Sequence, residues 1–377
     1  MVNINNPAEF IQSLGKFEGN AAAEILSFRV LKPDEVGDHA KKMKALRYWG
    51  VLPFAVTTAN ETIALYPFFN RPLSQWPVVL AFPEGEGFRT LASGIDKFVS
   101  CFTLGKMPYS ESKEDYLEAL PFLESAAAFF GDQNFESIKQ GISRKKITEE
   151  NYKVVGYPIA DPGSAVAEFF QVFHRFIVDG SNPLITWRAF AAKYPRFVPG
   201  WKMFLRTGIM EVEVHESAIS AAWRIISGPN VRDNKNTFDE PNYGKQMFLI
   251  TKDLTEDENV ERNNRLIDWT WGDADPIIAA ARLVLDDELS MEVKERVEEL
   301  VPAVEELFEN ENYNGSLHVK AALALEKEGK LQLALDAARN GNFWAFEPNE
   351  ETLTIAARVS ATMGDANLIS VMNLFQE

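Results

Sequence analysis

The chain has 377 residues, of which 46% are hydrophobic and 25% charged, a composition typical of a globular protein with two or more domains. Its formal charge of −17 disfavours nucleic acid as a partner, because phosphate recognition needs a basic surface. The single cysteine, Cys101, excludes an intrachain disulfide and a cysteine-rich zinc site, which indicates a reducing compartment.

The sequence shows no sign of membrane insertion or secretion. No stretch approaches roughly 18 uninterrupted apolar residues, and the first residues lack the basic and apolar regions of a signal peptide. We therefore expect a cytoplasmic protein that does not bind a membrane.

Two helices are predicted before the first strand. One begins at Asn6-Pro7, because asparagine is a good N-cap and proline is favoured in the first turn. The other covers residues 38–49, where Met43, Leu46 and Trp49 recur at helical spacing.

Four short runs of β-branched and aromatic residues follow, separated by turn-prone breaks. The runs are 50–58, 61–69, 76–82 and 87–92. Breaks this short favour an antiparallel meander over parallel strands with helical crossovers. Ser93 is then expected to cap a helix that carries Ile95, Phe98, Val99 and Phe102 on one face.

Helical periodicity dominates after about Leu104. We predict an α+β fold in which residues 1–105 form a curved antiparallel sheet with flanking helices and residues 106–377 form an all-α array of helical hairpins. The boundary is expected between 102 and 162. The long polar stretch 227–245 is a candidate for a further subdivision.

The last hundred residues contain a weak internal repeat. Paired alanines begin at Ala280, Ala321 and Ala356, and small residues at such points let helices approach closely. Gly329 and Gly364 follow the last two pairs, where each can end a helix in the left-handed conformation. The alternative is a set of ordinary alanine-rich helices with a coincidental register.

The residues Ala322, Leu325, Gly329 and Ala334 are similar to the pattern of tetratricopeptide-type repeats. The next copy departs from that pattern, because Ser360 and Ile369 occupy the large and small positions. The resemblance implies only a generic array of antiparallel helices.

No catalytic or metal-binding motif stands out. The four histidines, His39, His174, His215 and His318, are scattered singly, and no HExxH, GxSxG or phosphate-binding glycine loop occurs. A buried, inert thiol is expected at Cys101. We therefore expect no catalytic residue, no cofactor and no metal, with an enzyme of unrecognised class as an alternative.

The acid excess is unevenly distributed. Residues 1–150 carry 16 basic and 19 acidic side chains, whereas residues 251–310 carry 6 basic and 18 acidic ones. Such a segment would attract a basic protein partner. The alternative is that acidic helix faces serve solubility alone.

The runs "YWGVLPFAV", "ETIALYPFF", "WPVVLAF" and "GFRTLASGIDKFVSCF" resemble the SUKH superfamily, also called the Smi/Knr family, over residues 5–105. Ser93, Ile95, Phe98 and Phe102 occupy that family's last-strand-to-helix passage. The resemblance implies an α+β binding domain without catalytic residues. Bacterial members are often immunity proteins against toxins, many of them nucleases, and fungal members are regulatory scaffolds.

These observations predict a non-enzymatic protein-binding module, an immunity protein that neutralises a basic, nuclease-type toxin. The alternative is an intracellular scaffold or adaptor that uses its helical-repeat surface. The residues expected to contact the partner are aromatic side chains of the sheet and acidic side chains of its turn and of the helical region. They are Tyr66, Trp76, Phe88, Glu84, Glu86, Asp286, Asp287 and Glu288.

Overall fold

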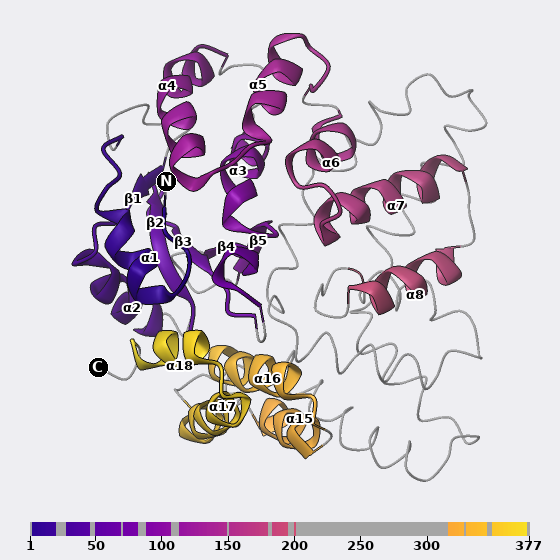
Figure 1. Ribbon diagram of the computed structural model, residues 1–377. Helices are drawn as coiled ribbons and strands as arrows, with labels where there is room; N and C mark the ends of the chain where they lie inside the picture. Colours follow the sequence, from indigo (N-terminus) through magenta and orange to yellow (C-terminus); the bar gives the residue numbers. More distant parts are fainter. Residues whose placement is uncertain are drawn as a thin grey trace. The chain divides into compact units, whose positions relative to one another are not determined.

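The computed structural model describes twelve stretches of the chain (Figure 1). They are residues 2–19, 28–45, 50–68, 71–81, 88–106, 113–148, 151–179, 183–194, 200, 316–327, 329–344 and 349–374. The chain forms two compact units. The first contains Met1–Gln171, Glu240–Lys252 and Gly364–Glu377, and the second contains Val172–Asp239 and Asp253–Met363.

A five-stranded antiparallel sheet is the centre of the first unit, and its strand order follows the chain, β1-β2-β3-β4-β5. The strands are β1 (Phe28–Val30), β2 (Leu52–Thr57), β3 (Thr62–Leu65), β4 (Val78–Ala81) and β5 (Phe88–Ala92). Every residue of β2, β3 and β4 is buried, so both faces of the sheet are covered.

Helices precede and follow these strands in the first unit. They are α1 (Pro7–Leu14), α2 (Glu35–Ala45), α3 (Phe98–Lys106), α4 (Lys113–Phe130), α5 (Phe135–Ser143), α6 (Tyr157–Ala160) and α18 (Ala366–Asn373). The 3₁₀ turns η1 (Leu73–Gln75) and η2 (Ile95–Lys97) and the π-helix η3 (Tyr152–Gly156) complete it. Figure 1 shows α3, α4 and α5 grouped beside the strands.

Aromatic rings join the sheet to these helices. Phe54 of β2 packs against Phe10 of α1, Phe98 of α3 and Phe130 of α4, with ring centroids 5.4–5.9 Å apart. Phe28 of β1 lies within 5.0 Å of the ring of Phe122, also in α4. The first unit therefore continues past residue 105, where the sequence places the end of the first domain, because α4 supplies part of the core of the sheet.

The described part of the second unit is helical. Its helices are α8 (Pro183–Lys193), α15 (Ser316–Lys327), α16 (Leu331–Trp344) and α17 (Glu350–Met363), and α7 (Ala165–Asp179) passes from one unit to the other. Ala322, Ala334 and Ala356 are fully buried where α15, α16 and α17 contact one another. Arg358 of α17 and Glu326 of α15 form a bidentate ion pair at 2.9 and 2.6 Å.

Several local predictions are confirmed. The backbone N–H of Glu9 donates to the Asn6 side chain at 2.9 Å, and Pro7 begins α1. All four predicted strands are present as an antiparallel meander. Gly329 and Gly364 adopt the left-handed conformation, with φ of +73° and +66°.

Other predictions are wrong or lie outside the described residues. The short strand β1 was not expected from the sequence. Ser93 does not cap the following helix, because Gly94 occupies that position and the Ser93 hydroxyl donates elsewhere. The polar stretch 227–245 and the alanine pair at Ala280 lie outside the residues that the structure describes.

Candidate functional site

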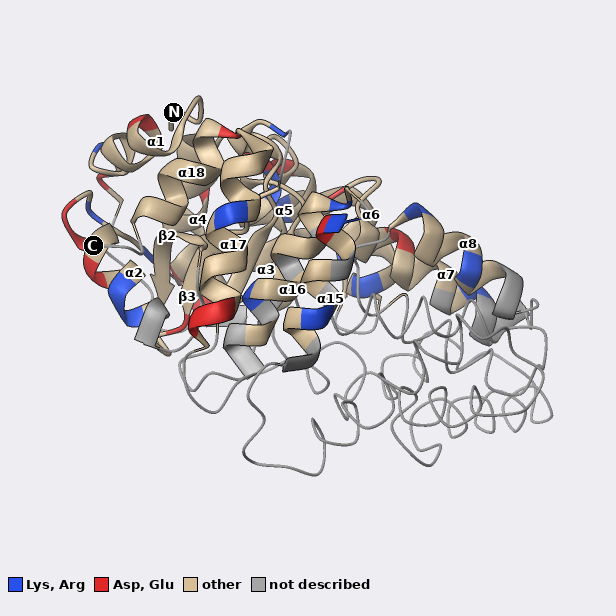
Figure 2. Cartoon of the chain, turned by 90° about the horizontal axis from the view of Figure 1, so that it is seen from below, with Lys and Arg blue, Asp and Glu red and all other residues tan. Residues whose placement is uncertain are grey.

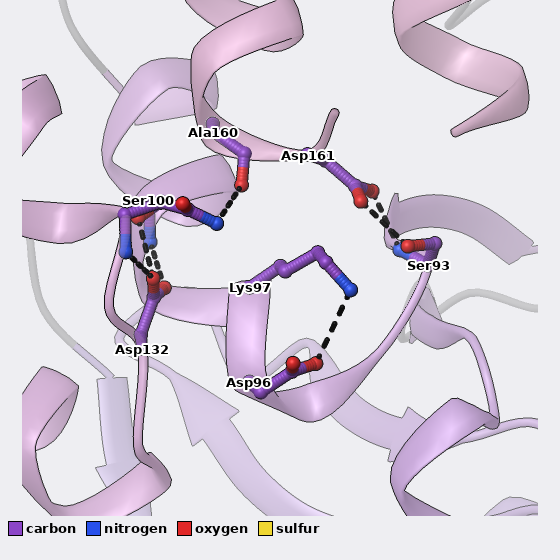
Figure 3. A network of polar contacts seen from close by, with 8 residues as sticks. Ser93, Asp96, Lys97, Ser100, Asp132, Ala160 and Asp161 are labelled. Atoms are coloured by element: carbon purple, nitrogen blue, oxygen red, sulfur yellow. Dashed lines mark hydrogen bonds and ion pairs between the residues drawn. The ribbon is translucent and has the colours of Figure 1, made fainter. Parts of the chain in front are cut away.

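A buried polar network surrounds the passage from β5 to α3, residues 93–100 (Figure 3). Two carboxylates from later segments reach this passage. Asp132 lies in the turn between α4 and α5, and Asp161 follows the end of α6. Their residues are only 7% and 1% exposed, respectively.

Asp161 binds the start of the passage. Its carboxylate accepts hydrogen bonds from the backbone N–H of Ser93 at 2.7 Å and from the Ser93 hydroxyl at 2.5 Å. Asp161 also holds the segment that follows it, since its backbone carbonyl accepts from the N–H of Ser164, just before α7.

Asp132 binds the first turn of α3 in a similar way. The backbone N–H of Ser100 donates to its carboxylate at 2.7 Å and the Ser100 hydroxyl donates at 2.8 Å. This places a carboxylate near the positive end of the α3 dipole. The side-chain amide of Asn134 links the two halves of the network by donating to the Ala160 carbonyl at 3.1 Å.

Burial perturbs the ionisable groups of this network. It raises the pKa of Asp132 to about 6, against the lowering effect of the hydrogen bonds from Ser100 and Asn134. Burial also raises the pKa of Asp161, against the lowering effect of Ser93 and of the Lys97 charge. The pKa of the Cys101 thiol is raised well above its ordinary value, first by burial and then by the charges of the two aspartates.

The geometry of the network favours a structural role. Each serine hydroxyl donates a hydrogen bond to a carboxylate, and each carboxylate also accepts one from a backbone N–H of the passage. The two aspartates therefore attach the α4–α5 turn and the end of α6 to the end of the sheet. Among the described residues no group of three His, Cys, Asp or Glu side chains is placed to hold a metal ion.

Sequence reasoning missed Asp132 and Asp161. The available signal was weak: each is a single aspartate between the end of one apolar helix and the start of the next, in "FFGDQN" and "PIADPG". Aspartate at such a place predicts a cap for the following helix. Here both carboxylates bind a segment that precedes them by 32 or 68 residues, and Asp132 also accepts from the N–H of Asn134 at 3.1 Å, just before α5.

The residues predicted to contact a partner do not form one surface in the described part of the chain. Tyr66 and Trp76 are buried, at 3% and 0% exposure, and the Trp76 indole donates to the Arg71 carbonyl at 3.1 Å. Both are core residues, because the sheet is covered on both faces, and neither offers surface to a partner.

The remaining predicted contact residues cannot be placed on a surface. Phe88 begins β5, but its side chain lies outside the described part of the structure. The acidic side chains lie outside the described residues altogether: Glu84, Glu86, Asp286, Asp287 and Glu288.

A buried positive charge, the ammonium of Lys153, lies in the π-helix η3. Lys153 is 7% exposed, and its ammonium lies 5.8 Å from the ring centroid of Tyr152 and 5.5 Å from that of Phe170. Tyr157 packs against both rings. These cation–π contacts keep the charge inside an aromatic cluster, so this segment contributes to packing in the first unit.

Comparison of the chain with protein-family models, with curated proteins and with solved structures gives no match in any of the three. Within the described residues, no helix has the length and apolar character needed to cross a membrane.

Proposed function

We propose that the protein is a non-enzymatic protein-binding module of the cytoplasm, an immunity protein that neutralises a basic, nuclease-type toxin. The observation that carries this proposal is the uneven charge, with 18 acidic against 6 basic side chains in residues 251–310. A complementary acidic surface accelerates association with a basic partner and selects it over neutral ones.

The described residues do not carry the acid excess. They contain 24 Lys and Arg against 21 Asp and Glu, and Figure 2 shows both signs interspersed along the described helices. The toxin-binding surface that we propose therefore lies in the acidic segments of the chain, including Asp286, Asp287 and Glu288. This proposed surface does not include the aromatic residues Tyr66 and Trp76, which are buried.

The resemblance of residues 5–105 to the SUKH superfamily supports the same proposal. An antiparallel meander that passes directly into a helix is compatible with such a domain. In this proposal the sheet-containing unit is a scaffold, held rigid by Asp132 and Asp161, and the acidic segments provide the contact.

Co-expression with toxins encoded beside its gene tests this proposal. The full chain should restore growth and co-purify with one toxin, and binding should weaken steeply as the salt concentration rises. D286N/D287N/E288Q should weaken binding, whereas D34N/E118Q/E350Q, which removes the same charge from exposed described positions, should not. If no neighbouring toxin binds and none is neutralised, the immunity role is wrong.

A second candidate function is a scaffold whose helical-hairpin array holds a protein partner. The specific observation in its favour is the pair of left-handed glycines, Gly329 and Gly364, which join successive helices, together with the 42% exposure of Leu323 on α15. In the full chain, Leu323→Glu should then release a partner that D286N/D287N/E288Q retains. The opposite pattern would favour the first candidate.

A further inference from the structure

A short basic turn follows α5 in a part of the chain that has almost balanced charge. Arg144, Lys145 and Lys146 are all exposed, and within the described residues none of their side chains forms an ion pair. Lys145 has a φ of +56°, and Asn60 is the other described non-glycine residue with a positive φ. We refer to residues 144–146 as the basic turn.

The basic turn is fixed in place by its own backbone. The N–H of Lys146 donates to the Gly141 carbonyl at 2.8 Å, and the N–H of Lys145 donates to the Ile142 carbonyl at 2.9 Å. This is the Schellman arrangement, in which the left-handed position normally holds glycine. The Asn151 amide also donates to the Lys146 carbonyl, at 3.0 Å. A lysine therefore occupies a strained position in a well-held turn, and such strain is typical of functional sites.

Exposed aliphatic side chains lie next to the basic turn. Val155 and Ile159 are 38% and 37% exposed, two of only four large hydrophobic side chains that are exposed among the described residues. They lie on η3 and α6. Buried Ile147, which directly follows the basic turn, lies over Gly156, where an added Cβ would meet it at 3.4 Å. Asn151, whose side-chain amide donates to the Lys146 carbonyl, accepts a hydrogen bond from the N–H of Val155 at 2.8 Å, so the basic turn lies close to the segment that carries this aliphatic pair.

The helix dipole explains only part of this arrangement. Cations at the C-terminus of α5 favour the helix, which accounts for the sign of the charge. It does not account for lysine in place of glycine at residue 145, nor for the exposed Val155 and Ile159.

We propose that the basic turn and the pair Val155/Ile159 form a docking surface for an acidic, amphipathic segment of another protein. Carboxylates of such a segment would pair with Arg144, Lys145 and Lys146, while its apolar side chains would cover the aliphatic pair. The overall charge of −17 does not prevent this, because salt screens charges beyond about 8 Å at physiological ionic strength.

Charge complementarity favours an acidic protein segment over other anions. Three cations are fewer than the roughly 4–8 that a polybasic lipid-binding cluster uses, and nucleic acid needs a longer basic track. The docking surface is independent of the proposed toxin site, whose partner is basic, so failure of one proposal leaves the other standing.

Fluorescence anisotropy of a labelled peptide of five Glu-Glu-Leu repeats, titrated with the full chain, tests the docking surface. We expect saturable binding that R144E/K145E/K146E and V155S/I159S each weaken by about tenfold or more. The matched variant K16E/K41E/K327E, which reverses three exposed charges elsewhere, should change binding by less than about twofold. Circular dichroism should show that all three variants remain folded.

The flanking carboxylates give a second test. Glu149 and Glu150 follow the basic turn in the sequence and lie outside the described residues. E149Q/E150Q should tighten peptide binding, since it removes repulsion near the acidic probe. Absence of saturable binding, or equal weakening in both charge-reversal variants, would overturn the proposal. A third outcome would also overturn the proposal. In it, R144E/K145E/K146E loses binding to phosphatidylserine vesicles but keeps binding to the peptide, which would indicate that the basic turn binds a lipid surface.

Discussion

Asp161 and Ser93 lie 68 residues apart in the sequence, yet the Asp161 carboxylate accepts hydrogen bonds from both the N–H and the hydroxyl of Ser93, at 2.7 and 2.5 Å. The contact ties the end of the sheet to the segment after α6. Because Asp161 is almost fully buried, little solvent competes for these donors.

Asp161→Ala should destabilise the first unit by about 2–3 kcal/mol, because it leaves two donors of Ser93 without their acceptor. Asp161→Asn should cost less, since the amide oxygen still accepts one of these hydrogen bonds. Urea denaturation at fixed pH measures both effects, with Asp34→Ala at an exposed position as the control. A free energy of unfolding for Asp161→Ala within about 0.5 kcal/mol of the wild type would contradict a tethering role.

The raised pKa of Asp132 predicts that this residue makes the protein less stable as the pH rises. Its native pKa of about 6 lies above the ordinary value of 3.8, so the native state binds the proton more tightly than the unfolded chain does. Its stabilising contribution is complete below about pH 4 and is lost as the pH rises through about 6. A difference of about two pKa units between the native and unfolded states corresponds to about 3 kcal/mol in the free energy of unfolding.

Comparison with Asp132→Asn isolates this effect from other carboxyl groups. Glu35 and Glu326 have lowered pKa values, through their hydrogen bonds to Arg29 and Arg358, and their stabilising contributions are lost in acid instead. The difference in the free energy of unfolding between wild type and Asp132→Asn should therefore change by about 2–3 kcal/mol from pH 4 to pH 7. A difference independent of pH would show that the native pKa of Asp132 is not raised above its value in the unfolded chain.

Cys101 should be unreactive in the native protein. Its thiol is buried and its pKa is raised by that burial and by the nearby aspartates, so little thiolate is present at neutral pH. Iodoacetamide should label it slowly in buffer and rapidly in guanidinium chloride, as measured by intact mass. Fast native labelling would indicate that the passage between β5 and α3 opens readily.

The strands and helix ends were predictable because their signals are local. Runs of β-branched residues between turn-forming breaks specify the meander. Asn6 and Pro7 mark the start of α1, because Asn6 is its N-cap and Pro7 its first residue. Gly329 and Gly364 likewise reveal their backbone conformation through residue type alone.

Long-range features were not predictable in this way. Phe122 belongs to a helical sequence, and nothing in its neighbourhood indicates that its ring packs on Phe28 of the sheet. The same holds for Asp132 and Asp161, whose partners lie far back in the chain. Tyr66 and Trp76 were predicted to contact a partner, but both are buried, and the strands β3 and β4 next to them are covered on both faces.

Phe122 provides a test of the longer first unit. Phe122→Ala should destabilise the core formed with the sheet by about 3–5 kcal/mol, because it removes a ring that contacts Phe17 and Phe28. Leu117→Ala, on the same helix but 55% exposed, is the matched control and should have little effect. Equal, small effects of both changes would mean that α4 is not part of this core.

Lys145 and Gly364 make opposite predictions at the same kind of backbone position. Lys145→Gly should stabilise the protein by about 0.5–1 kcal/mol, because glycine adopts a positive φ without steric cost. Gly364→Ala should destabilise it by about 1 kcal/mol through conformation alone, since no atom lies within 4 Å of the added Cβ. Thermal unfolding of both variants measures the two effects. Lys145→Gly should also weaken binding of the acidic peptide, because it removes one positive charge from the docking surface. That result would show that Lys145 contributes to binding at a position where lysine makes the protein less stable than glycine would.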